Sequence, residues 1–133
     1  MKFVVAYAAT AVAFLALDIL WLTTIALKFY RDQLGPMLLE KPSLPISAVF
    51  YLIYIGAIVF LAVLPALNGG SWVNALVAGA ILGIAAYGTY DITNLATLKG
   101  WPLVLSATDL AWGTALTAVS ATFGYAVTLW LKV

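Results

Sequence analysis

Three aspartates stand inside apolar stretches of the sequence, and they are the residues most able to do chemistry there. Asp18 lies ten residues before Lys28, Asp91 lies eight before Lys99, and Asp109 follows the same connection. At a rise of about 1.5 Å per helical residue, these positions are about 12–15 Å deep in a bilayer core about 30 Å thick. A carboxylate at mid-membrane costs about 2.5–3.5 kcal/mol, so three at one depth indicate a site.

Aromatic and amide side chains recur at helical spacing around these acids. Tyr87, Asp91 and Asn94 are spaced i, i+4, i+7, which places them on one face of a helix. A tryptophan follows three residues after Asp18 and again after Asp109. We therefore expect the ligand-binding residues to be Asp18, Trp21, Tyr51, Tyr54, Tyr87, Tyr90, Asp91, Asn94, Asp109 and Trp112.

The chemistry that this set favours is the binding of positive charge. No lysine, arginine or histidine accompanies the acids in the apolar stretches, and tyrosine and tryptophan faces attract organic cations. The sequence therefore predicts binding or transport of a proton, a cation or a cationic amphiphile at the aspartate cluster. Acids close together in a low dielectric cannot all stay ionised without a cation, so binding is expected to strengthen as pH rises.

Two alternatives remain open. One is an intramembrane lipid-modifying enzyme in which one aspartate is the general acid and another the base. The other is a purely structural polar core, in which each acid is hydrogen-bonded between helices. The chain has no cysteine and no histidine, which removes thiolate nucleophiles and histidine bases. Since no nucleophile–base pair or cofactor motif is found either, the sequence argues against an enzyme, predicts no cofactor and leaves a metal open.

Composition defines the class of protein. Of the 133 residues, 65% are hydrophobic and 8% are charged, whereas soluble domains carry about 25% charged residues. The mean hydropathy is +1.11, and a net charge of +1 gives no sign of a nucleic-acid partner. Lipid must therefore surround the chain. We predict one all-α domain over residues 1–133, a polytopic four-transmembrane-helix bundle with spans at about 3–27, 46–67, 72–98 and 102–131.

The connections between these spans differ in length and charge. Residues 68–71 and 99–102 are tight turns rich in glycine, and the second ends on Pro102. The longer segment from Lys28 to Pro45 mixes charged and apolar residues, so we expect a short amphipathic piece on the membrane surface.

Positive charge predicts the orientation. Four basic residues lie at the first and third connections, and two lie at the chain ends: Lys28, Arg31, Lys41 and Lys99 against Lys2 and Lys132. Because cytoplasmic loops carry more lysine and arginine, both termini are expected outside.

Small residues and tryptophans are interpreted as packing and anchoring features. Gly79 and Gly83 form a small-xxx-small pair, and Gly113, Thr117, Ser120 and Gly124 line one side of the last span. The tryptophans at the span ends are typical interfacial anchors: Trp72, Trp101 and Trp130.

The run Ala86-Tyr-Gly-Thr-Tyr-Asp-Ile-Thr-Asn-Leu-Ala-Thr-Leu98, followed by Trp101-Pro102, resembles the most distinctive segment of a bacterial family of small membrane proteins. That family is named as domain of unknown function 2177, and the resemblance covers nearly the whole chain. It implies a multi-pass protein of the bacterial cytoplasmic (inner) membrane whose partners are lipids, and it brings no established activity. Four-helix multidrug exporters of similar length use one membrane acid per chain and work as dimers, so a homo-oligomer is included among the expectations, although no motif matches theirs.

Overall fold

The computed structural model describes residues 1–133 and is helical throughout, with no strand. The first helix consists of α1 (Lys2–Trp21), a π-helical turn η1 (Leu22–Ala26), α2 (Leu27–Leu34) and a 3-10 turn η2 (Gly35–Met37). The second consists of α3 (Leu44–Ile58), a π-helical turn η3 (Val59–Val63) and α4 (Leu64–Leu67). The third is α5 (Trp72–Thr97), and the fourth is α6 (Leu103–Leu131).

All four helices are long and apolar enough to cross a membrane. The four-helix membrane bundle predicted from hydropathy is therefore confirmed. Tight connections join α4 to α5 and α5 to α6, as the glycine-rich turns indicated, and Gly69 and Gly100 adopt positive φ there.

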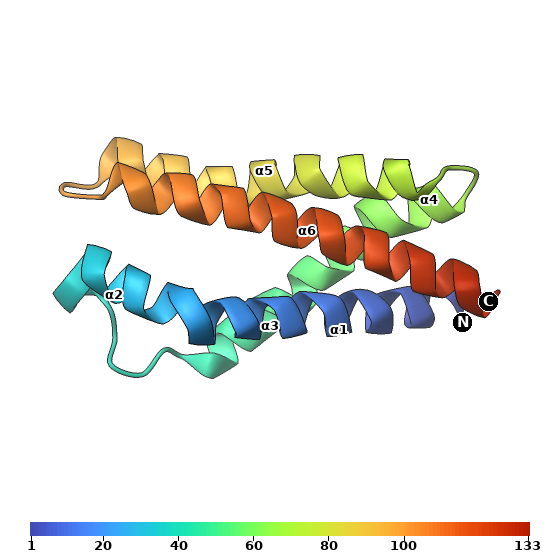
Figure 1. The fold of residues 1–133 in the computed structure, drawn as a ribbon, viewed down its shortest axis with the longest axis horizontal. Coiled ribbons are helices and arrows are strands. Elements are labelled where there is room, and N and C mark those ends of the chain that lie inside the picture. The colour runs from blue at the N-terminus through green and yellow to red at the C-terminus, as the bar shows by residue number, and fades with distance from the viewer.

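The first helix is longer than expected. It continues past residue 27 through α2 to Met37, in line with α1 (Figure 1), and only residues 38–43 are non-helical before α3. The expected surface piece is thus mostly an extension of the first helix. No glycine or proline interrupts residues 28–34, and the α-helix ends at Gly35, whose φ of 55° is followed by Pro36.

The π-helical turn η1 changes which face α2 presents. In this turn the Thr23 hydroxyl donates a hydrogen bond to the Ile19 carbonyl at 2.8 Å, and the Thr24 hydroxyl donates one to the Leu20 carbonyl at 2.6 Å. The two hydroxyls thus bind backbone carbonyls at the point where the backbone hydrogen bonds change from the α to the π pattern. A single π turn takes up one extra residue. Tyr30 follows Asp18 by twelve residues. In a regular α-helix the Tyr30 side chain would point about 120° away from that of Asp18 around the helix axis, and the extra residue in the π-helical turn reduces this angle to about 20°.

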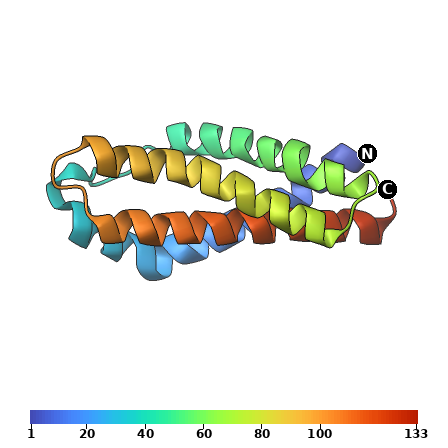
Figure 2. The ribbon, with the colours of Figure 1, turned by 90° about the horizontal axis from the view of Figure 1, so that it is seen from above.

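Helix α6 lies at the centre of the packing and contacts both α5 and α1. Gly79 and Gly83 of α5 face α6 so closely that an added Cβ would lie 2.9 Å from the Cα of Ala118 or 2.8 Å from the carbonyl of Gly113. The small-xxx-small interpretation is confirmed, since close helix approach requires small residues there. The α5–α6 pair and the oblique course of α3 are visible in Figures 1 and 2.

The predicted small face of the last span is also buried. Gly113, Thr117, Ser120 and Gly124 all lie in the interior. Gly124 faces Thr10 of α1, and the Thr117 hydroxyl is hydrogen-bonded to the Tyr54 hydroxyl at 2.8 Å.

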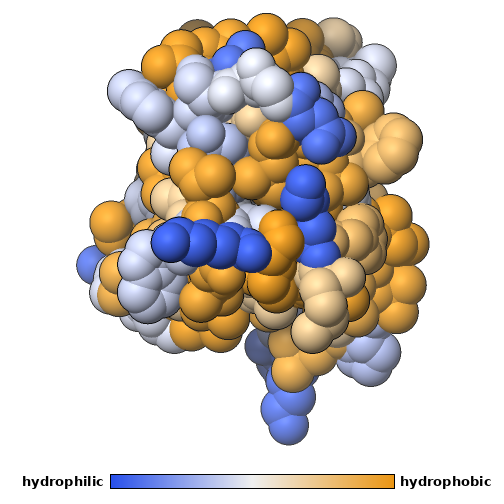
Figure 3. Space-filling view, turned by 90° about the vertical axis from the view of Figure 1, so that its right-hand side faces the viewer, coloured by the Kyte–Doolittle hydropathy of each residue, from blue (hydrophilic) through white to orange (hydrophobic).

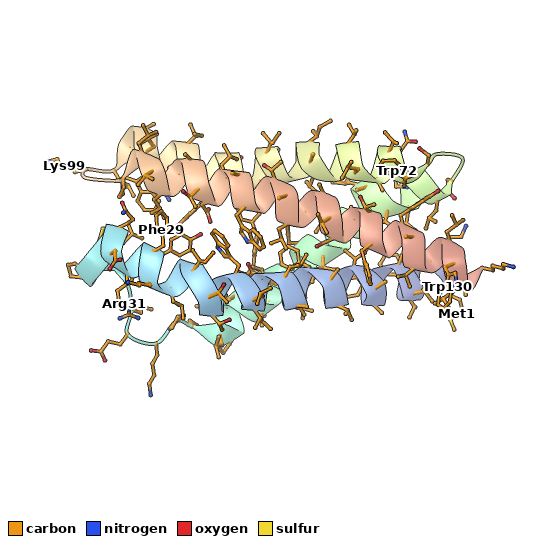
Figure 4. All side chains as sticks on the ribbon, viewed as in Figure 1. Met1, Phe29, Arg31, Trp72, Lys99 and Trp130 are labelled. Carbon is orange, nitrogen blue, oxygen red and sulfur yellow. The ribbon has the colours of Figure 1, made fainter.

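The two ends of the bundle carry different residues. Arg31 and Lys99 lie at one end, whereas Met1, Trp72 and Trp130 lie at the other (Figure 4). Figure 3 views the end that holds the termini, where hydrophobic residues surround a few hydrophilic ones. Two of the four basic residues assigned to the connections, Arg31 and Lys99, therefore lie at the end of the bundle opposite the termini.

Candidate functional site

A cleft of about 480 Å³ lies between α3, α5 and α6. Its wall is mostly aromatic, and it contains a single carboxylate and no basic side chain: Ser47, Phe50, Tyr51, Tyr54, Ala86, Tyr87, Tyr90 and Asp109. The cleft opens sideways, because Phe50 and Tyr90 at its rim are 59% and 55% exposed. Five of the ten predicted site residues thus lie in one cleft.

Helical spacing on two helices builds the aromatic wall. Tyr51 and Tyr54 are three residues apart on α3, as Tyr87 and Tyr90 are on α5, so each pair lies on one helix face. The rings of Tyr54 and Tyr87 meet edge-on with centroids 6.2 Å apart. Gly113 makes room for this contact, since a Cβ there would lie 2.1 Å from Cγ of Tyr87.

Asp109 is held by a tyrosine from the extended first helix. The Tyr30 hydroxyl of α2 donates a hydrogen bond of 2.5 Å to Oδ1 of Asp109. The π-helical turn η1 brings Tyr30 to this face, close to the face of Asp18. Because Tyr30 engages one carboxylate oxygen, the other oxygen is left for a second partner.

A smaller cavity of about 100 Å³ adjoins Asp109 on the side toward the α5–α6 connection. Tyr30, Tyr90, Asp91, Asp109 and three leucines line it. Asp91 is fully buried, neither of its carboxylate oxygens makes a hydrogen bond, and Asp109 lines the same small cavity. The two acids therefore form a pair at the boundary of the cleft.

The backbone of Asp91 is fixed by its neighbours. Trp101 Nε1 donates to the Ser106 hydroxyl at 2.9 Å, and that hydroxyl donates to the Asp91 carbonyl at 2.7 Å. The Trp101 ring also contacts Tyr90 edge-on. Trp101 therefore supports the Asp91 position in addition to its place at a span end.

Asp18 has a separate environment between α1 and α6. Trp112 Nε1 donates a long hydrogen bond of 3.4 Å to Asp18 Oδ1. Trp21 and Trp112 are stacked, with ring centroids 4.6 Å apart and planes 9° apart. The repeated Asp-x-x-Trp pattern thus yields one tryptophan pair, which partly encloses Asp18.

The three acids form a row with Asp109 in the middle. Asp91 lies opposite Ser106, which is one helical turn, or about 4.5 Å, nearer the α5–α6 connection than Asp109. Asp18 contacts Trp112, which is one turn of α6 past Asp109 in the other direction, and it lines neither cavity. No three acids come together as a group that could hold a metal ion. Asn94 lines neither cavity, although it is one turn from Asp91.

Three residues of the site are not among the predicted site residues: Tyr30, Ser47 and Phe50. The sequence predicts Tyr30 within the surface segment and Ser47 and Phe50 within an apolar span. The spacing of Ser47, Phe50, Tyr51 and Tyr54 at i, i+3, i+4 and i+7 could have indicated their common face. Nothing in the sequence around residue 30 marks the π-helical turn that directs Tyr30 inward.

Fold and site together define a small integral membrane protein with an acidic, aromatic cleft between its helices. The family model described as predicted membrane protein (DUF2177) matches residues 3–126, so the chain belongs to that family. The resemblance stated from the Tyr-Asp-x-Thr-Asn segment agrees with this membership. No match was found among curated proteins or among solved structures.

Proposed function

We propose that this protein binds an organic cation with apolar substituents, a cationic amphiphile, in the cleft, and that Asp109 is its counter-ion. The observation that carries this proposal is a carboxylate in the wall of a cleft that has no basic side chain. A carboxylate in low dielectric is stabilised by a nearby positive charge, and the protein supplies none.

The size and lining of the cleft favour an organic cation. Its volume of about 480 Å³ is in the range of clefts that hold small organic molecules, about 300–1,000 Å³. Five aromatic rings line it, and an organic cation over an aromatic face gains about 0.5–2 kcal/mol per contact. The geometry favours this ligand over a metal ion, because a metal would need more oxygen ligands than one carboxylate supplies.

The reading as a purely structural core accounts for less of the site. Interhelical hydrogen bonds explain Tyr30 with Asp109 and Trp112 with Asp18. They do not explain Asp91, which makes no side-chain hydrogen bond, or an aromatic cleft left open on one side.

The cellular setting and transport complete the proposal. We further propose that the protein lies in the bacterial cytoplasmic membrane with both termini outside, since four of its six basic residues lie at the first and third connections, and Arg31 and Lys99 lie at the end opposite the termini. The protein would be a transporter if the cation entered the cleft from one side of the membrane and was released on the other. Uptake of a radiolabelled cation into liposomes that contain the protein tests this part.

The binding experiment uses tetraphenylphosphonium as the probe and triphenylphosphine oxide as the neutral control. In detergent, the cation should raise the thermal stability of the protein more at about pH 8 than at about pH 5, because protons compete for Asp109. At about 100 times its Kd, a ligand selective for the folded state contributes about 2.7 kcal/mol. The neutral compound should have no effect at either pH.

Asp109→Asn tests the assigned counter-ion. It should abolish the stabilisation by tetraphenylphosphonium, whereas Asp32→Asn, at an exposed acid of α2, should leave it unchanged. If a broad screen of organic cations stabilises the wild-type protein at neither pH, cation binding is wrong.

A further inference from the structure

The smaller cavity beside the cleft is lined by an acid that does not line the cleft. Asp91 is fully buried and lines this cavity of about 100 Å³, and its two carboxylate oxygens make no hydrogen bond. Asp109 lines both the smaller cavity and the cleft. The two spaces therefore share one carboxyl group.

Chemistry limits the charge of this pair. A buried, unpaired carboxylate costs several kcal/mol, and two carboxylates that line one cavity of about 100 Å³ also repel each other. A protonated carboxyl group has an O–H donor, which can bond to the neighbouring carboxylate. One proton between Asp91 and Asp109 gives both acids a hydrogen-bond partner, since Tyr30 engages only Oδ1 of Asp109.

The surrounding titratable groups leave the pair without a positive partner. Tyr30 of α2 and Tyr90 of α5 line the smaller cavity with the pair, and Tyr51 of α3 and Tyr87 of α5 line the cleft with Asp109. Asp18 of α1 lies at Trp112, one turn of α6 past Asp109. All of these groups are neutral or acidic. No ammonium or guanidinium group is present to stabilise a second negative charge.

We propose that Asp91 and Asp109 hold one proton between them, so that the cleft presents a single negative charge and selects singly charged organic cations. This inference rests on the proposed function of the cleft. When a cation binds, Asp109 remains the carboxylate and the proton stays on Asp91, so no bond to carbon is made or broken. Asp91 is thus neutral, adds no charge to the site and donates a hydrogen bond to the Asp109 carboxylate.

Infrared spectroscopy tests the proton without any cation. At neutral pH, the wild-type protein should show the C=O stretching band of a protonated carboxylic acid, and Asp91→Asn should remove this component. Asp18→Asn should leave the component that Asp91→Asn removes. If the band is unaffected by Asp91→Asn, or disappears when a cation binds, the shared proton is wrong.

Binding of two matched probes tests the selectivity. N-methyl-4,4′-bipyridinium carries one charge, and its doubly methylated form carries two on the same scaffold. The wild-type protein should bind the monocation more tightly. Since Asp91→Asn replaces one neutral group by another, it should change either affinity by less than about threefold, whereas loss of an ionised neighbour would weaken dication binding by more than about tenfold.

The outcomes separate this inference from the proposed function. If neither bipyridinium and no other cation binds, the proposed function fails, while the infrared band still decides whether the pair holds a proton. If the cations bind but the dication binds more tightly, or Asp91→Asn weakens its binding more than about tenfold, only the single-charge inference is overturned.

Discussion

The ring of Tyr87 occupies space that any side chain at position 113 would need. A Cβ at Gly113 would lie 2.1 Å from Tyr87 Cγ, so Gly113→Ala must displace the ring into the cleft or push α5 from α6. Overpacking of this kind costs about 1–3 kcal/mol. We expect Gly113→Ala to weaken tetraphenylphosphonium binding more than about tenfold, as measured by calorimetry.

Gly88→Ala is the matched control for this change. It also adds one methyl group on the α5–α6 pair, but its Cβ would lie 3.6 Å from Leu110 Cδ1, which is ordinary contact. Binding should be unchanged. Equal losses in the two variants would mean that the position of the Tyr87 ring does not shape the cleft.

Tyr30 offers a second test at a single hydrogen bond. Tyr30→Phe removes the donor to Asp109 and keeps the ring, so the unfolding free energy should fall by about 0.6–2 kcal/mol. Cation binding should weaken as well, because the carboxylate loses its orientation. Tyr7→Phe removes another interhelical bond, from Tyr7 to the Leu52 carbonyl at 2.8 Å, and should lower stability without affecting binding. A binding loss of similar size in Tyr7→Phe would make the effect of Tyr30 merely structural.

The sequence predicts only some of these site residues. The depth of an acid follows from counting residues to the nearest charged connection, which is why the sequence predicts all three aspartates at one level. The direction in which the acid points around the helix axis depends on how the helices pack, and counting residues along the sequence does not give it. Asp18 consequently faces a tryptophan pair and lies outside both cavities, although its predicted depth was similar.

At the scale of elements, the π-helical turn η1 is a one-residue insertion in an otherwise continuous helix. Deleting Thr23 should allow a regular α-helix in which Tyr30 still lies about 20° from Asp18. We therefore expect the deletion to be tolerated, with tetraphenylphosphonium affinity within about threefold of the wild-type value.

Deleting one residue from a regular helix should behave differently. Removal of the exposed Ala85 from α5 rotates Tyr87 and Asp91 by about 100° relative to Gly79 and Gly83. Binding and folding should then both fail, as judged by calorimetry and gel filtration. If the Thr23 deletion is as damaging as the Ala85 deletion, η1 is not an insertion that the helix can lose.

The four spans, the two tight turns and the small-residue faces were predictable from hydropathy and residue size, which act locally. The continuation of the first helix was not. Lys28, Arg31 and Asp32 are exposed in the structure, as they would be on a membrane-surface helix, so both arrangements satisfy the same pattern. The hydrogen bond between Tyr30 and Asp109 distinguishes the two arrangements. Because these residues are 79 positions apart, no pattern in the sequence near residue 30 predicts it.

At the scale of the whole molecule, charge predicts the orientation. Alkaline phosphatase fused after Val133 should be active outside the cytoplasm, because Arg31 and Lys99 lie at the end opposite the termini. The same enzyme inserted after Gly100 should be inactive. A cytoplasmic reporter that works only when fused after Val133 would reverse the orientation, and added lysines near Met1 should weaken the preference.

The sideways opening of the cleft decides how a ligand is delivered and how its affinity must be expressed. Phe50 and Tyr90 form a rim on the flank of the bundle, where acyl chains surround the helices, so the proposed amphiphile would enter by lateral diffusion within one leaflet. Occupancy then depends on the mole fraction of ligand in the lipid, and its concentration in the buffer matters only through partitioning. Adding empty liposomes at constant total ligand should dilute the bound state, even though the aqueous volume is unchanged.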